Sequence, residues 1–454
     1  MVFANCFEGV NGEISADIII VGGDFGSCYA LHRFRGLGHT VKLLEAGSDF
    51  GGMWYFNKYL RAQVESEVPI YQLSLPEAWR NFKFQGEVPG YIELQKYFST
   101  MTKSLDLHKD AIFNPRAFMS FFPGLTTIPG PIIYPASWPS NPDLTNKKVG
   151  IIGYATLFPD PEAEEGKNNY GALFTFAKEK SQTGYQYDLC TESFYTTPHT
   201  ERQRLYEDLW ARGGFDKTSN AEVYTFWASK MRARMQDAEK KEIMALVPSL
   251  EMDYWECIDR ADVELVNLKT NGIARMTKTG VVTRAEEGEE KIHELDVLVV
   301  ATAYDNVTGF LFDMSILDHN EMTSQEKWKQ GICTWLGMLV PEMPSAFLLY
   351  GPQAPSGLAN GPPFLDMQVD WLAELLNKTK EEGEPIEVKS SAAKAYREKN
   401  LAVYKHLLIS ETQSWWNGAN IPGKPNEPLF WVAGLQAWKQ QCEEGMRDLS
   451  KYLV

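Results

Sequence analysis

The stretch DIIIVGGDFGSCYALHRF, residues 17–34, decides the fold of this chain. Its β-branched apolar residues predict a buried parallel strand over Asp17–Val21, and a helix is predicted over Cys28–Leu37 after a glycine-containing turn. A second strand is predicted over Thr40–Leu44, directly before Glu45. This order of elements indicates a βαβ unit of the dinucleotide-binding type, with an acidic residue about 20 residues after the turn, where a ribose hydroxyl is held.

The turn itself departs from the G-x-G-x-x-G pattern of phosphate-binding loops. Its three glycine positions read Gly22, Asp24 and Ser27. A carboxylate at Asp24 would lie where two phosphates bind, and like charges 4 Å apart repel by about 1 kcal/mol in water and several times more near a protein surface. The alternative is a turn one residue shorter, in which Gly23 and Gly26 take the glycine roles.

The composition excludes several classes of protein. The 454 residues are 44% hydrophobic and 23% charged, as expected for a folded chain of two or three domains. A net charge of −16 argues against nucleic acid and anionic membranes as partners. No apolar run approaches the roughly 20 residues of a membrane span. The first residues lack a signal-peptide pattern, so a cytoplasmic location is expected.

The sequence also lacks the common motifs of metal and nucleophilic catalysis. Its six cysteines form no C-x-x-C pair, and it contains no H-E-x-x-H, G-x-S-x-G or Walker motif. We therefore expect no metal site, no disulfide framework and no serine triad.

A second nucleotide-type start, KKVGIIGYATLFPD, spans residues 147–160. The strand predicted over Val149–Ile152 leads to Gly153, but Pro159 and Pro161 come before a helix can form. Further along, helices are predicted over residues 201–237 and about 366–412, with strands between residues 263 and 303.

Several segments, in this order, resemble the flavin-dependent Baeyer–Villiger monooxygenases over nearly the whole chain. The segments that carry the resemblance are EAGSDFGGMWYFNKY (45–59), VESE (64–67), IPGPIIYPASWP (128–139), DVLVVATAYDNVTG (296–309), GPQAPSGLANGP (351–362) and SWWNGANIPGKP (414–425). The resemblance implies an α/β fold with a helical C-terminal part. Residues 1–146 and 300–454 would form a Rossmann-like FAD-type domain, and residues 147–299 a truncated NADPH-type domain. In this reading Gly22, Glu45 and Trp54 are the FAD-site positions.

The positions that carry the family's chemistry are altered. The histidine of the family fingerprint is Tyr134, and the acidic partner of the family's catalytic arginine is Gln63. The loop that supplies this arginine is missing from residues 246–260. Together with Asp24, these departures predict that the fold is kept, that oxygen insertion is lost, that the FAD positions are vestigial, and that no cofactor binds.

A cofactor-independent cyclase or isomerase is therefore expected, which would shape an apolar terpenoid or polyketide intermediate for intramolecular, Diels–Alder-type cyclisation in secondary metabolism. Its partner would be a small apolar substrate. The candidate groups that would activate this substrate are Tyr134, Gln63, Arg61, Trp415 and Asn417. Two alternatives stay open. One is a divergent FAD-dependent Baeyer–Villiger-type monooxygenase, favoured by the retained Gly-Gly-Met-Trp segment, and the other is a non-catalytic ligand-binding protein.

Overall fold

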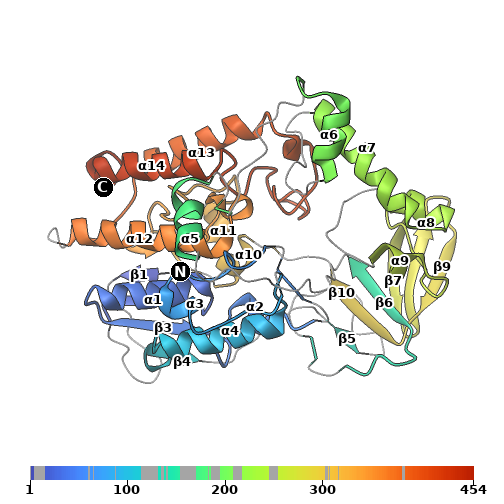
Figure 1. Ribbon diagram of the computed structural model, residues 1–454, viewed down its shortest axis with the longest axis horizontal. Coiled ribbons are helices and arrows are strands. Elements are labelled where there is room, and N and C mark those ends of the chain that lie inside the picture. Colours follow the sequence, from blue (N-terminus) through green and yellow to red (C-terminus); the bar gives the residue numbers. More distant parts are fainter. Residues whose placement is uncertain are drawn as a thin grey trace.

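The structure of the chain is a computed structural model. It describes residues 2–4, 16–59, 62–64, 66–86, 88–113, 131–133, 138–139, 142–153, 170–181, 184–185, 195–207, 217–244, 254–301, 305, 307–314, 316–380 and 384–454. Within these ranges the strands form one five-stranded sheet and two three-stranded sheets. The five-stranded sheet and the C-terminal helices lie in one lobe, and the two smaller sheets lie in the other (Figure 1).

The five-stranded sheet contains the predicted βαβ unit. In sheet order its strands are β11 (Ala346–Phe347), β1 (Val2–Ala4), β2 (Ile18–Val21), β3 (Val41–Glu45) and β4 (Ala111–Phe113). Strands β2, β3 and β4 are parallel to one another, with Ile18 opposite Val41, whereas β1 is antiparallel to both of its neighbours. The two predicted strands and the parallel pairing are therefore confirmed.

Helix α1 (Phe25–Gly36) connects β2 to β3 and packs against α12 (Gly361–Thr379). It begins three residues before the predicted start because Asp24 caps it. The contact with α12 favours a glycine at position 26, since a Cβ there would lie 2.6 Å from Cδ2 of Leu365 and this side chain would have to move. Gly26 therefore serves close helix packing, although the third glycine of the expected pattern is Ser27.

The remaining helices of this lobe cover the sheet and build its core. They are α2 (Met53–Phe56), α3 (Pro76–Trp79), α4 (Tyr91–Ser104), α5 (Tyr170–Glu179), α10 (Gly309–Asp313), α11 (Ser324–Lys327), α13 (Ser390–Tyr404) and α14 (Leu435–Arg447). Short 3₁₀ turns occur at His108–Asp110, Pro355–Leu358, Leu408–Glu411 and Leu449–Lys451. One buried apolar cluster joins α1, α4, α12 and α14, so segments far apart in the sequence fix the position of the first turn.

Among the described residues, the second lobe contains a parallel sheet, an antiparallel sheet and four helices. In sheet order the parallel strands are β5 (Ile132–Ile133), β10 (Val297–Ala301) and β6 (Val149–Gly153), and the antiparallel strands are β7 (Asn271–Thr277), β8 (Gly280–Ala285) and β9 (Glu290–Glu294). The helices are α6 (His199–Glu207), α7 (Lys217–Ala233), α8 (Ala238–Ile243) and α9 (Tyr254–Asp259). The helix predicted over residues 201–237 thus occurs as two helices, α6 and α7. Among the described helices, none combines the length and the apolar composition needed to cross a membrane.

Candidate functional site

The turn between β2 and α1 is fixed by backbone contacts on both sides. Gly22 has a φ of +104°, and its N–H donates to the carbonyl of Leu44 at 2.8 Å. A Cβ at Gly23 would lie 2.7 Å from Oε2 of Glu45, so this position also needs a glycine. The carbonyl of Gly23 accepts the N–H of Gly51 at 2.9 Å, which ties the turn to the segment before α2.

Asp24 places its own carboxylate at the N-terminus of α1. Its Oδ1 accepts the N–H of Phe25 at 2.8 Å, and the N–H of Met53 also hydrogen-bonds to the carboxylate. The side chain lies against Gly52, where a Cβ would come within 2.5 Å of the Cβ of Asp24. Asp24 is partly buried, and this loss of hydration, opposed by the two amides and assisted by the charge of Glu45, raises the pKa of its carboxyl to about 6.

Glu45 ends strand β3 and lies on the other side of Gly23. It is 5% exposed, and its Oε1 accepts the N–H of Gly47 at 2.6 Å. Burial raises the pKa of this carboxyl, although the amides of Gly47, Gly23 and Ala46 stabilise its charge. Two carboxyl groups therefore share one turn, which makes the site unfavourable for a further anion while both are ionised.

Aromatic side chains extend from Asp24 toward α12. Trp54 is buried, and its Nε1 donates to the Tyr71 hydroxyl at 3.1 Å. The pKa values of Tyr71 and Tyr350 are raised, first by burial, and the charge of Asp24 contributes to both shifts. Tyr350 has an unusual φ of +58°, and its hydroxyl donates to the carbonyl of Ser356 at 2.7 Å. Both tyrosines therefore lie within electrostatic reach of the carboxylate.

Asn360 lies at the N-terminus of α12 and presents an unused amide. The residue is 1% exposed, and in the described part of the chain neither its Oδ1 nor its Nδ2 has a hydrogen-bond partner. The hydroxyl of Tyr350 is close by, since a Cβ at Gly361 would lie 3.5 Å from it. A buried amide without partners costs about 1–3 kcal/mol, so this position suits a ligand that both donates and accepts a hydrogen bond.

The five candidate substrate-activating residues are distributed over several parts of the chain. Tyr134 and Arg61 lie outside the described residues. Gln63 forms a β-bridge with Gly90, and its Nε2 donates to the carbonyl of Val88 at 3.2 Å. The other two lie in the loop before residue 425.

That loop uses Trp415 and Asn417 for packing and for backbone hydrogen bonds. Trp415 packs edge-on against Phe430, with ring centroids 5.7 Å apart. Asn417 is fully buried; its Nδ2 donates to two backbone carbonyls and its Oδ1 accepts two backbone N–H groups. All four hydrogen-bonding positions of the Asn417 amide are therefore used inside the loop.

Sequence reasoning missed three residues that define this site: Gly52, Tyr350 and Asn360. The GPQAPSGLANGP segment contained a usable signal, because an asparagine followed by Gly-Pro is typical of a helix start. The contact between Gly52 and Asp24 joins two separate loops, so only the tertiary structure could reveal it.

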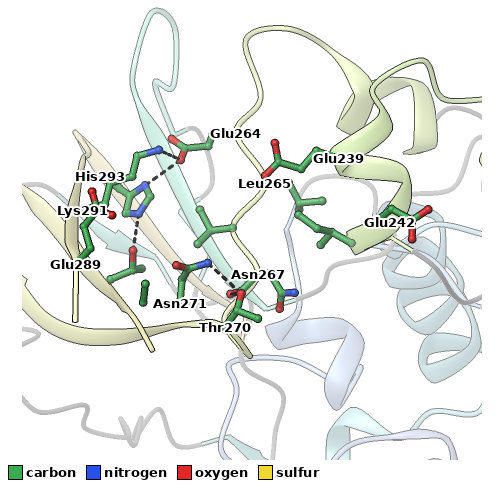
Figure 2. Close-up of a pocket in the computed structure, with 14 residues that line it drawn as sticks. Glu239, Glu242, Glu264, Leu265, Asn267, Thr270, Asn271, Glu289, Lys291 and His293 are labelled. Atoms are coloured by element: carbon green, nitrogen blue, oxygen red, sulfur yellow. Dashed lines mark hydrogen bonds and ion pairs between the residues drawn. The ribbon is translucent and has the colours of Figure 1, made fainter. Parts of the chain in front are cut away.

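A separate pocket of about 470 Å³ lies between α8 and the antiparallel sheet (Figure 2). Figure 2 shows Lys291 and His293 near Glu264, with Nζ of Lys291 at 2.6 Å and Nδ1 of His293 at 3.4 Å from the Glu264 carboxylate. The lining includes four glutamates but only one lysine and one histidine, so the pocket does not suit an anionic ligand. In the described part of the chain, no group of three or more potential metal ligands is placed to hold a metal ion.

Comparisons with known proteins identify relatives over nearly the whole chain. No protein-family model matches the chain. The chain is 28% identical to the FAD-binding monooxygenase acrE of Aspergillus aculeatus, over 96% of this chain and 88% of that protein. It is also 28% identical to a cyclopentanone 1,2-monooxygenase of a Comamonas species, over 96% of each chain. An oxidized steroid monooxygenase solved with bound NADP superposes with a TM-score of 0.84 at 25% identity, covering 96% of this chain and 98% of that one.

These relatives correct three expectations. The absence of a cofactor, the cofactor-independent cyclase or isomerase of terpenoid or polyketide intermediates, and the non-redox enzyme class are all wrong. Relatives that match nearly the whole chain are named as monooxygenases, and acrE is named as FAD-binding. The monooxygenase alternative fits better. The physical reason lies at Asp24, because its repulsion of a phosphate depends on whether its carboxyl is ionised. With its pKa raised to about 6, this carboxyl can become neutral near physiological pH, so its presence does not rule out a bound phosphate.

Proposed function

We propose that the chain is a divergent FAD-dependent monooxygenase of the Baeyer–Villiger type, because it is similar to such monooxygenases over nearly its whole length. The observation that carries the proposal is the 28% identity to an FAD-binding monooxygenase over 96% of the chain. Relatives named for cyclopentanone and acetone support a small apolar ketone as the substrate. The net charge of −16 is consistent with a small-molecule substrate and argues against nucleic acid.

The two ends of the site fit FAD. Glu45 lies at the end of the second strand of the βαβ unit, where a carboxylate holds a ribose hydroxyl in folds of this type. The unpartnered amide of Asn360 offers one donor group and one acceptor to the polar edge of a ring. A bound cofactor would satisfy both groups.

The centre of the site fits FAD only when Asp24 is neutral or moved aside. The ionised carboxylate already takes the N–H groups of Phe25 and Met53, and it would repel a pyrophosphate. A protonated Asp24 removes the repulsion and can itself donate a hydrogen bond.

When bound, FAD would supply the activation of dioxygen. The protein's own groups would bind and enclose the reactants. Glu45 and Asn360 would hold the two ends of the cofactor. The buried Trp54, hydrogen-bonded to the partly buried Tyr71, would limit the access of water to the space beside Asp24.

The first experiment is the visible absorption spectrum of the purified protein, before and after incubation with FAD at about pH 5.5 and about pH 8. We expect bound flavin after incubation at the lower pH, and oxygen consumption with cyclopentanone and NADPH. The variant Glu45→Gln should bind FAD about tenfold more weakly, because a hydrogen bond to a charged group is lost. If the wild type and uncharged variants of Asp24 bind no flavin at either pH, the proposal is wrong.

A further inference from the structure

The carboxylate of Asp24 is held by two segments that are distant in sequence. It accepts the N–H of Phe25, the first residue of α1, and the N–H of Met53, the first residue of α2. Gly51 donates its N–H to Gly23, which fixes the distance between the two segments. Helix N-termini and the amides of such turns bind phosphates in related folds. In this protein the side chain of Asp24 occupies those amides instead.

The surroundings of Asp24 are apolar or acidic. The titratable groups that face it are Cys28 of α1, Glu45 of β3, and Tyr71 and Tyr350 from the loops. Burial raises the pKa of Cys28. The pKa values of the partly buried Tyr71 and of Tyr350, which is 40% exposed, are also raised, so these three groups stay protonated at neutral pH. The charge that acts on Asp24 is therefore that of Glu45, which disfavours a second anion.

We infer that the Asp24 carboxylate is an intramolecular occupant of the phosphate cradle, and that FAD loads only after this carboxylate is protonated or displaced. The inference rests on the proposed function and adds a condition for cofactor loading. The Asp24 carboxylate would then compete with the FAD pyrophosphate for the same backbone amides. Loading then depends on pH, in the direction of tighter binding in acid.

The expected pH dependence follows from the competition. If only the neutral form of Asp24 admits the pyrophosphate, the dissociation constant rises about tenfold for each pH unit above the pKa of about 6. At about pH 8 the wild type should therefore bind FAD roughly 100-fold more weakly than at low pH. Riboflavin, which lacks phosphates, should bind with little pH dependence.

The test is a titration of the apo protein with FAD, ADP and riboflavin across about pH 5 to 8.5, followed by flavin fluorescence and, for ADP, by calorimetry. The variants are Asp24→Asn and Asp24→Ser, and the serine variant keeps a side chain that caps helices well. Both should bind FAD and ADP with nearly constant affinity, roughly 100-fold tighter than the wild type at about pH 8. Asp49→Asn is the matched control. The carboxylate of Asp49 lies in the segment before Met53, is about half exposed and is paired with His108, so its replacement should change FAD affinity less than about threefold.

Two results would overturn the inference, and they can be told apart. Wild-type binding that is independent of pH and equal to that of Asp24→Asn would refute the internal competitor and leave the proposed function intact. Failure of the wild type and of both folded Asp24 variants to bind FAD at every pH would refute the proposed function as well. Circular dichroism of each variant establishes that it is folded. Glu45→Gln should keep the pH dependence, because Asp24 still titrates.

Discussion

The replacement Asp24→Asn should stabilise the apo protein at neutral pH, which is unusual for the removal of a helix-capping charge. The raised pKa means that folding disfavours the ionised form of Asp24. The contribution of Asp24 to the free energy of unfolding is therefore fully present below the unfolded pKa of 3.8 and is lost as the pH rises through about 6. Above pH 6 the free energy of unfolding is lower by about 3 kcal/mol because of this difference in pKa. Asparagine keeps an oxygen for the N–H of Phe25 and carries no charge.

The measurement is urea unfolding of the apo wild type and Asp24→Asn at several pH values between about 4 and 8. All other titrating groups are common to both proteins, so their effects cancel in the difference. The stability of the variant relative to the wild type should rise by about 2–3 kcal/mol across this range, mostly between pH 4 and 6. Hydrogen exchange of the α1 amides should show the same trend locally.

A second capping aspartate provides the control. Asp237 caps α8, is exposed, and accepts the N–H groups of Glu239 and Lys240. Asp237→Asn should lose about 0.3–1 kcal/mol at neutral pH, because its charge favours the helix N-terminus. A difference between wild type and Asp24→Asn that does not vary with pH would show that the carboxylate is well solvated, and the argument from burial would then be wrong.

Three further substitutions test the packing and the site. Gly26→Ala should destabilise the protein by about 1–3 kcal/mol in urea unfolding, since the new Cβ would lie 2.6 Å from Cδ2 of Leu365; unchanged stability would mean that α1 and α12 separate freely. Asn360→Ala should leave apo stability unchanged or slightly raised, because an unpartnered buried amide is removed, and should weaken FAD binding about five- to tenfold in fluorescence titrations; a large loss of stability would contradict the unused amide. Asn417→Ala should cost about 2–4 kcal/mol through the loss of four hydrogen bonds, with flavin affinity unchanged, and a selective loss of affinity would instead place Asn417 in the site.

The local order of elements in residues 17–45 was readable from the sequence. Short-range patterns determine a strand of β-branched residues, a glycine turn and a helix, and the observed β2, α1 and β3 agree with the prediction. The family was also readable, because several specific segments occur in the right order. The helix boundaries were less accurate, since α1 begins at Phe25 rather than Cys28 through the cap made by Asp24.

The function was misjudged because altered motifs were read as lost chemistry. A sequence gives the identity of an ionisable group but not its charge, since the charge depends on burial. The pKa of Asp24 depends on Met53, Glu45 and the aromatic side chains around it, which the fold brings together from three segments. Asp24 was therefore treated as a fixed anion, whereas the tertiary structure makes it a group that can change charge near neutral pH.

The sequence by itself therefore determined the βαβ unit, the resemblance to Baeyer–Villiger monooxygenases and the position of a carboxyl group in the turn after the first strand of this unit. Only the tertiary structure decided where that carboxyl points, which amides it binds, and that the amide of Asn360 is left without a partner at the start of α12. The physical reason is one of range. Strand and helix patterns depend on neighbours a few residues away. Burial and hydrogen-bond satisfaction depend on contacts between segments more than 300 residues apart, such as that between Gly26 and Leu365.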